Sequence, residues 1–307
     1  MRLRAPAKLN LYLRVLGERA DGYHEIETLF ERIDLADELT FEDDLRELAL
    51  TCSDPTLSCG EDNLVLKAAR LLRSTSGVAH GARVHLLKRI PIAAGLGGGS
   101  SDAAATLLGL NRLWNLGLQP SQLQPLAAQL GSDVPFFLSE ALFAIGRGRG
   151  EICESLASVP PLAHVLVVPR ERLSTNDIYR AFAQRGDGAQ IGLTAPRPSL
   201  TMVAHALRNG SLGELAKGLW NDLEPVAIRR CPVIANIQSH LLACGALGSR
   251  LSGSGPSVFG LCTDARHAQD VAAQMRTRVA PSCRIEIIQT DGSSIEISRS
   301  EISHPAP

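Results

Sequence analysis

The chain has 307 residues, enough for one large domain or two ordinary domains with full hydrophobic cores. Hydrophobic residues make up 45% of it and charged residues 21%, which is typical of a folded globular protein and excludes a disordered chain. The formal net charge is only -1, with 31 basic and 32 acidic residues. This balance argues against nucleic acid or an anionic membrane as a partner, so affinity for a charged ligand must be local.

The cysteines and the N-terminus indicate the compartment. The seven cysteines are odd in number and include no CxxC pair, which predicts a reducing compartment with neither disulfides nor structural zinc. The N-terminal residues contain no continuous apolar segment, and no stretch approaches the roughly 20 apolar residues of a membrane span. We therefore expect a cytoplasmic protein with no membrane partner. The sequence does not indicate its oligomeric state.

The first predicted elements form a β-hairpin. Residues 8–16 alternate in polarity as a half-buried strand requires, 17–22 carry turn residues, and 26–33 form the return strand. A solvated sheet face is the ordinary interpretation of the polar set. Lys8 and Asn10, however, could equally line a cleft.

Helices alternate with strands along the rest of the first half. Residues 61–63 (EDN) precede an apolar-periodic segment at 64–72, and an Asp or Asn in that place indicates the N-terminus of a helix. Residues 82–90 are a predicted strand, and 102–114 and 121–130 are predicted helices.

The second half begins with a short buried strand at 163–168, followed by helices over much of 175–245. A turn and a strand occupy 250–260, and a helix at 265–277 and a strand at 284–289 follow. Helices that cross between strands predict an α+β domain of ferredoxin-like type.

These elements predict two domains and a tail. We expect an N-terminal α+β domain over residues 1–160 and a smaller ferredoxin-like domain over 161–290. The polar residues 291–307, which end in Pro-Ala-Pro, are a predicted flexible tail.

The strongest local signal is GLGGGSS at residues 95–101, between a predicted strand and a predicted helix. Glycines let backbone N–H groups approach a ligand, and a helix N-terminus favours anions, so the segment predicts a phosphate-binding loop. Ser100 and Ser101 could cap the helix or contact phosphate or a magnesium ion. The alternative is a flexible glycine turn with an ordinary serine cap.

Two well-known phosphate loops are excluded. A Walker A loop needs a lysine before its final Ser or Thr, and this segment has none. A dinucleotide fingerprint needs a third glycine where Ser100 stands, and an acid about 20 residues further on. Residues 103–132 contain no Asp or Glu at all.

That acid-free stretch draws attention to Asp133, which follows a helix stop and precedes Pro135. An Asp before a proline-started helix is a natural N-cap, and a carboxylate among apolar residues could also be a base that activates a hydroxyl. Both roles are compatible, since capping constrains the side chain.

Two further segments are candidate binding sites. Tyr23 beside His24 in a polar turn could stack on a base, although spacing alone slightly favours Tyr23 packing on the sheet edge. The segment 251–257 (LSGSGPS) could close over phosphates or form a hairpin turn.

Together these motifs resemble a known family. Residues 91–101 are similar to the ATP-binding motif of the GHMP kinases, and residues 251–259 to their C-terminal motif. Residues 5–10 (APAKLN), 21–24 (DGYH) and 130–136 (LGSDVPF) resemble the branch that phosphorylates a small-molecule cytidine diphosphate substrate. The resemblance implies the two-domain GHMP kinase fold, with ATP and Mg2+ and an active site between the domains.

The resemblance also implies roles for residues. Lys8 and Asp133 match the catalytic pair of the family. Asn10, Tyr23, His24, Thr175 and Tyr179 match positions that hold the cytidine diphosphate substrate. The positions that match its ATP site are Asn63, Leu64, Pro91, Ile92, Ala93, Ala94, Gly95, Leu96, Gly97, Gly98, Gly99, Ser100 and Ser101. The protein ligands of the metal stay unknown.

Three alternatives compete with this interpretation. One is a GHMP kinase for homoserine, mevalonate or a sugar, which the base-stacking segment 21–24 argues against. Another is a nucleotide-binding regulator without catalysis, which the presence of Lys8 and Asp133 argues against. A nucleic-acid-binding module is disfavoured by the neutral net charge.

Overall fold

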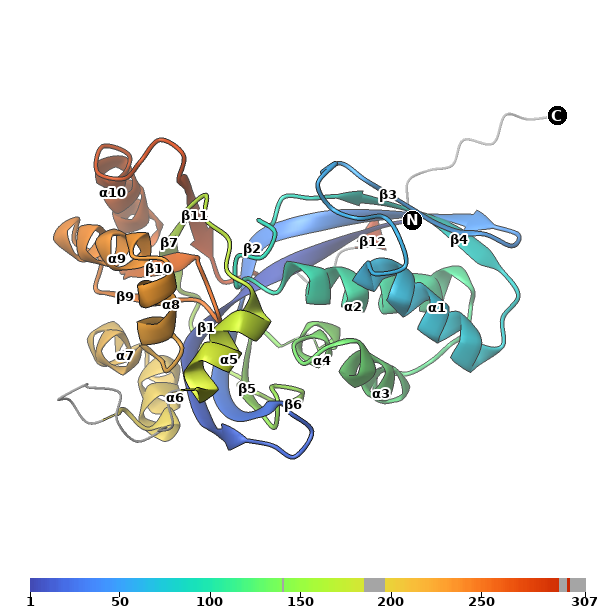
Figure 1. Cartoon of the computed structure of the whole chain (residues 1–307), viewed down its shortest axis with the longest axis horizontal. Helices are drawn as coiled ribbons and strands as arrows, with labels where there is room; N and C mark the ends of the chain where they lie inside the picture. The colour runs from blue at the N-terminus through green and yellow to red at the C-terminus, as the bar shows by residue number, and fades with distance from the viewer. Residues whose placement is uncertain (140, 185–196, 293–296, 299–307) are drawn as a thin grey trace.

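The computed structural model describes residues 1–139, 141–184, 197–292 and 297–298. Two α+β units lie side by side, with the first half of the chain forming one and most of the second half the other (Figure 1). Among the described residues, no helix is both long and apolar enough to cross a membrane.

The N-terminal sheet is built around a long antiparallel hairpin. Its two strands are β1 (Arg2–Glu18) and β2 (His24–Asp44). Beside β2 lie β4 (Gly81–Leu87) and then β3 (Leu48–Cys52), which runs parallel to β4. A second branch adds β5 (Phe143–Arg147) to β2 and β6 (Ile152–Ser155) to β5. The predicted hairpin is confirmed.

Four helices cover one face of this sheet. They are α1 (Leu64–Ser76), α2 (Gly98–Leu113), α3 (Pro120–Leu130) and α4 (Val134–Leu138). Helix α2 packs on β1 and β2 with small side chains, including the buried Ala103, Ala104 and Ala105. At Gly109 the approach is so close that a Cβ atom would lie 2.7 Å from the Phe41 ring. This alanine- and glycine-rich face brings the start of α2 close to the sheet.

The second domain has a four-stranded antiparallel sheet in the order β11-β7-β10-β9. Its strands are β7 (Ala163–Val168), β9 (Gly248–Leu251), β10 (Val258–Cys262) and β11 (Arg284–Gln289). Between β7 and β9 lie α5 (Thr175–Ala183), α6 (Leu200–Arg208), α7 (Leu212–Gly218), α8 (Glu224–Arg230) and α9 (Val233–Ala243). Helix α10 (Ala265–Met275) connects β10 to β11. This order and connectivity confirm the ferredoxin-like prediction.

The two domains share a buried boundary along β1. Strand β8 (Trp220–Asn221) of the second half pairs with β1, and the Tyr12 hydroxyl donates to Pro198 O at 3.1 Å. Across the same boundary, fully buried Glu31 and His164 meet at 2.8 Å. The prediction that residues 8–16 form a half-buried strand is therefore wrong. Both faces are covered through most of the segment, because the second domain packs on the face that a lone sheet would expose to water.

Part of the predicted tail also needs correction. Strand β12 (Ile297–Ser298) pairs with Leu3 and Arg2 of β1, and buried Asp291 donates its backbone N–H to Arg32 O. These residues of the segment 291–307 pack on the N-terminal domain. The rest of it, 293–296 and 299–307, lies outside the described residues.

Candidate active site

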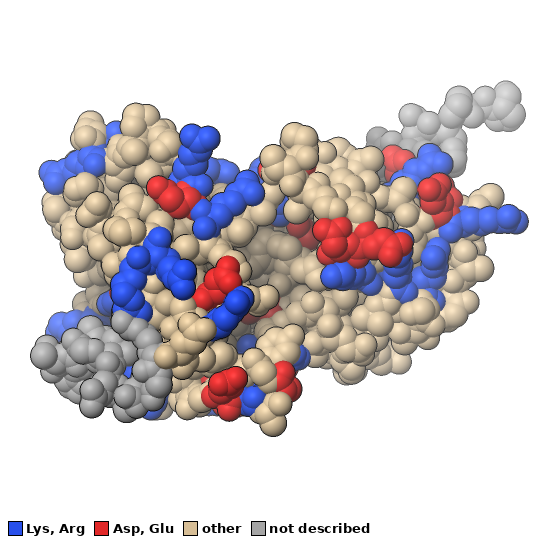
Figure 2. Space-filling model, viewed as in Figure 1, with Lys and Arg blue, Asp and Glu red and all other residues tan. Residues whose placement is uncertain are grey.

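A cleft of about 1050 Å³ opens between the two domains. Its walls come from β1, the turn after it, the glycine-rich loop, the start of α4, and α5 with residues 253–254 of the second domain. Figure 2 shows this face of the molecule hollowed between the domains.

The glycine-rich loop requires glycine at particular positions. Gly95 and Gly97 have φ values of 79° and 71°, in the left-handed region that favours glycine. A Cβ atom on Gly95 would lie 2.2 Å from Ser252 O, and one on Gly97 would lie 3.0 Å from the Lys8 side chain. The loop is thus fitted between β1 and the turn that contains Ser252.

Helix α2 starts within this loop, earlier than residue 102. Its N-cap is Gly97, and no side chain caps it, so the first N–H groups of the helix are available to an anionic ligand. Ser100 and Ser101 lie inside the helix, which makes the alternative of an ordinary serine cap wrong. Ser100 lines the cleft, whereas Ser101 is buried.

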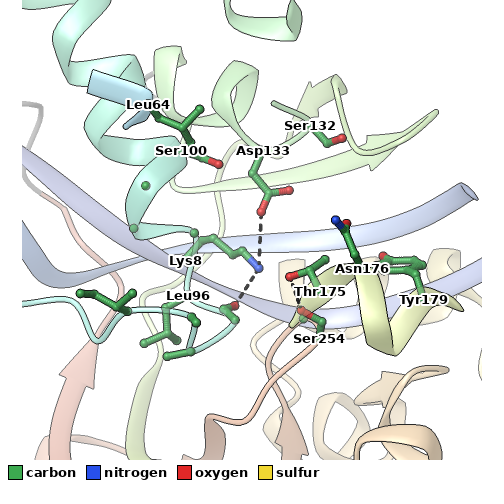
Figure 3. A pocket seen from close by; sticks show the side chains of 18 of the residues that line it. Lys8, Leu64, Leu96, Ser100, Ser132, Asp133, Thr175, Asn176, Tyr179 and Ser254 are labelled. Carbon is green, nitrogen blue, oxygen red and sulfur yellow. Dashed lines mark hydrogen bonds and ion pairs between the residues drawn. The ribbon is translucent and has the colours of Figure 1, made fainter. Parts of the chain in front are cut away.

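Lys8 and Asp133 face each other across the cleft, as Figure 3 shows. Lys8 Nζ lies 3.7 Å from Asp133 Oδ2 and donates a hydrogen bond to Gly95 O at 2.9 Å. It also donates to Asn10 Oδ1, while the Asn10 amide donates to Thr28 Oγ1 at 2.8 Å. Burial lowers the pKa of Lys8 below its ordinary value, and the Asp133 carboxylate opposes that shift.

Asp133 occupies the N-cap position of α4, but its side chain makes no capping hydrogen bond. The prediction that this side chain caps a helix is wrong, because the carboxylate faces Lys8 instead. It is 29% exposed, so it borders the open cleft and remains accessible to a ligand.

Residues of both domains that are predicted to bind the substrate lie together near Lys8 and Asp133. The His24 and Tyr179 rings are tilted against each other with centroids 5.1 Å apart, and Thr175 Oγ1 lies 2.8 Å from Ser254 Oγ. Burial, with a smaller contribution from Asp133, raises the pKa of Tyr179 above its usual range. Tyr23 also lines the cleft and is 52% exposed, so much of its ring is open to a ligand.

The predicted adenine end lies where α1 begins. Asn63 accepts the Val65 N–H at 2.9 Å and donates to Ser58 O at 2.7 Å, so the predicted helix N-terminus is confirmed and Asn63 is its cap. Asn63 and Leu64 line the cleft together with residues 91–100.

The sequence interpretation missed several residues that line the cleft. They are Thr56, Leu57, Ser58, Lys88, Asn176, Gly253 and Ser254, together with Arg149 and Arg180. Residues 253–254 belong to the segment 251–257, which the sequence identifies only as a turn that could close over phosphates. The others carry no local motif, and only the packing of distant segments reveals them.

The buried side chain of Asn221 holds the turn at residues 251–257 in place. Asn221 donates to Leu251 O at 2.9 Å and to Gly253 O at 2.7 Å. A Cβ atom on Gly253 would lie 3.1 Å from Lys8 Nζ, so Asn221 fixes a turn that touches the predicted catalytic lysine.

A buried charge cluster lies behind the glycine-rich loop. Lys88 Nζ contacts Asp37 Oδ2 at 2.5 Å and Asp102 Oδ2 at 2.9 Å, while Asp102 Oδ1 has no hydrogen-bond partner within the described structure. Burial raises the pKa of Asp102 to about 7, although Lys88 opposes the shift. Asp102 therefore does more than complement the dipole of α2.

The described residues contain no cluster of three or more His, Cys, Asp or Glu side chains that could hold a metal ion. Magnesium, however, usually binds through one or two carboxylates together with substrate phosphates. Asp133 in the open cleft fits that smaller requirement.

Comparisons with known proteins agree on one family. Residues 63–141 match the profile of the GHMP kinases N terminal domain, and residues 203–280 match that of the GHMP kinases C terminal domain. The sequence is 46% identical over 273 residues to the 4-diphosphocytidyl-2-C-methyl-D-erythritol kinase of Pelotomaculum thermopropionicum, covering 89% of this chain and 92% of that protein. It is 38% identical to the enzyme of the same name from Gloeobacter violaceus, covering 99% and 98% of the two chains.

Solved structures share the fold of this chain. A crystal structure of 4-(cytidine 5'-diphospho)-2C-methyl-D-erythritol kinase superimposes with a TM-score of 0.77 at 37% identity, covering 95% of this chain and all of that one. A homoserine kinase from Cytophaga hutchinsonii superimposes with a TM-score of 0.73 over 95% and 94% of the two chains. At 21% identity, this second likeness shows the fold alone.

Proposed function

The chain belongs to the 4-diphosphocytidyl-2-C-methyl-D-erythritol kinases of the GHMP kinase family, and we propose that its cleft performs their reaction with Lys8 and Asp133 at the centre. The γ-phosphoryl group of ATP passes to the 2-hydroxyl of 4-diphosphocytidyl-2-C-methyl-D-erythritol, in the non-mevalonate isoprenoid pathway. The observation that carries this proposal is the Lys8–Asp133 pair, which faces the same cleft as the uncapped start of α2.

Asp133 accepts the proton of the attacking hydroxyl. Its carboxylate is open to the cleft and free of capping hydrogen bonds, and Lys8 Nζ lies 3.7 Å from its Oδ2. Lys8 also stabilises the charge on the transferred group, because phosphoryl transfer proceeds through a loose transition state in which positioning and charge dominate. Gly95 O and Asn10 hold the Lys8 ammonium group in place for this role.

The nucleotide occupies the part of the cleft that is formed by the glycine-rich loop and the start of α1. The glycine-rich loop and the first turn of α2 offer backbone N–H groups to the phosphates of ATP, and the adenine lies near Asn63 and Leu64. Asp133 is the cleft carboxylate that would lie beside a magnesium ion bound with the nucleotide, and such an ion would neutralise phosphate charge.

The cytidine end of the substrate binds near His24 and Tyr179, with Tyr23 available for stacking. The three rings line one region of the cleft, and Tyr23 is exposed enough to receive a base. Thr175, whose hydroxyl is hydrogen-bonded to that of Ser254, contributes to substrate binding from the second domain.

Asn10 is hydrogen-bonded to Lys8 and Thr28, so its direct contact with the substrate stays a prediction.

The free thiols of all seven cysteines support the reducing cytoplasm as the compartment.

A substrate panel tests the reaction. Magnesium-dependent release of ADP from ATP is measured with 4-diphosphocytidyl-2-C-methyl-D-erythritol, homoserine, mevalonate and galactose. We expect turnover with the cytidyl substrate alone. Turnover only with another alcohol would contradict the cytidine site, and failure with all four, from folded protein that binds ATP, would favour a regulator.

The Asp133→Asn variant tests the base. A positioned base contributes about 10²- to 10⁴-fold to the rate, so we expect kcat to fall by that range while the Kd for ATP and the melting temperature are retained. Asp270→Asn, in the exposed face of α10, is the matched control and should retain full activity. A folded Asp133→Asn enzyme with near-normal turnover would refute the assignment.

A further inference from the structure

Arg149 lines the cleft and has no part in the reaction as proposed. It lies in the tight turn between β5 and β6, flanked by Gly148 and Gly150, whose φ values of 71° and 113° suit glycine. Its guanidinium lies 4.5 Å from the centroid of the Tyr23 ring and donates to Ala128 O at 3.2 Å. The side chain is thus held in place from two sides.

The charge of Arg149 is only loosely compensated. Its nearest ion-pair partner is Glu151, at 3.8 Å from Nε, and the other oxygen of that carboxylate accepts the Arg149 backbone N–H. A guanidinium has five N–H donors, and within the described structure only the bond to Ala128 O uses one. Most of its donors therefore remain free for a ligand in the cleft.

The other Lys and Arg residues that line the described cleft each have an ionic partner within 4 Å. Arg180 pairs with Asp177 at 2.8 Å, and Lys88 is buried between two aspartates. Lys8 is bound to Gly95 O and faces Asp133, so it belongs to the reaction centre. Within the described part of the cleft, Arg149 and the exposed Arg180 are left for a second anionic group, and Arg149 is the one held against the Tyr23 ring.

Its position suits the middle of the proposed substrate. On one side of Arg149 is the Tyr23 ring, at the cytidine end. On the other, the turn lies against the reaction centre, since a Cβ atom on Gly150 would be 3.7 Å from Asp133 Oδ1. A diphosphate that joins a cytidine at Tyr23 to a hydroxyl at Asp133 must pass between these two points.

On the basis of the proposed function, we propose that Arg149 binds the diphosphate of the cytidine diphosphate substrate. A guanidinium offers paired N–H donors that match phosphate oxygens, and its contacts with Tyr23 and Ala128 O hold it in position before the ligand arrives. Arg149 contributes to substrate binding and not to the chemical step.

The test compares Arg149→Gln with Arg147→Gln. Arg147 lies two residues away at the end of β5, is exposed and pairs with Glu154 at 3.1 Å, so it is the matched control. Loss of a charge-assisted contact should raise the KM for the cytidyl substrate about 10- to 100-fold in Arg149→Gln. The KM for ATP and kcat should be retained, and Arg147→Gln should behave like the wild type.

Binding of cytidine diphosphate and of cytidine, measured by calorimetry, separates this role from support of Tyr23. In the wild type the diphosphate should bind more tightly, and Arg149→Gln should lose most of that advantage while binding cytidine normally. Equal weakening of both ligands, an unchanged preference, or a fall in kcat alone would overturn the proposal. If Arg149→Gln fails to fold, Arg149→Lys retains the charge without the paired donors and should show a smaller loss of the same preference.

Both ligands bind without turnover, so this comparison does not depend on the kinase assay. A wild-type enzyme that prefers cytidine diphosphate but does not phosphorylate the cytidyl substrate would refute the proposed function and leave the role of Arg149 standing. Turnover of the cytidyl substrate without any preference for cytidine diphosphate over cytidine would support the proposed function and refute the role of Arg149.

Discussion

In the wild-type protein, the free energy of unfolding should fall as pH rises, because the buried Asp102 carboxyl group loses a proton. Asp102→Asn should not show this fall. The pKa of this buried carboxyl group is raised from 3.8 to about 7, so between these values the folded protein retains a proton that the unfolded chain has released. The resulting stabilisation is complete below about pH 4 and is lost as pH rises through about 7. The amide of the Asp102→Asn variant would have no proton to lose in this range, and Lys88 would keep Asp37 as its partner.

The magnitude follows from the two pKa values. A difference of about three pKa units, at about 1.4 kcal/mol each, gives about 4 kcal/mol in the free energy of unfolding. The stability of Asp102→Asn relative to the wild type should therefore grow by a few kcal/mol from pH 4 to pH 8. Urea unfolding across that range measures the difference, and other titrating groups cancel because both proteins carry them.

Asp270→Asn is again the control, since Asp270 is exposed on α10 and is not part of the buried charge cluster. The reasoning is refuted if the wild type and Asp102→Asn give parallel curves. Parallel curves would mean that Lys88 keeps Asp102 ionised throughout and that burial does not dominate.

Two further substitutions test how the cleft is held. Gly95→Ala should weaken ATP binding by more than about tenfold, because its Cβ atom would lie 2.2 Å from Ser252 O and displace the loop. Gly117→Ala has a similar φ of 67° but no neighbour within 4 Å, so it should reduce stability and spare the Kd for ATP; equal effects on the Kd would contradict the steric argument. Asn221→Asp removes both donors to the turn against Lys8, and each unsatisfied buried group costs about 1–3 kcal/mol. We expect a lower melting temperature and a lower kcat, and an unchanged kcat would show that the turn does not position Lys8.

Much of the local architecture could be predicted from the sequence, because periodicity and caps act over short distances. The apolar repeat after Asn63 predicted α1, and the glycines before an alanine-rich segment predicted a phosphate loop at the start of α2. Alternation in residues 8–16 predicted a strand, but it also suggested a solvated face. A strand pattern records only which side chains alternate, and it does not record that a second domain will cover the other face.

The assembled cleft was decided by tertiary structure. Asp133 has the sequence context of a helix cap, and only packing turns its carboxylate toward Lys8, which lies 125 positions earlier in the chain. Arg149 belongs to no motif and enters the cleft because a tight turn of the sheet carries it beside Tyr23. Short-range patterns reflect backbone preferences and burial along one element. Which distant side chains share a site depends on how the two domains dock along β1, and that docking leaves no periodic trace in the sequence.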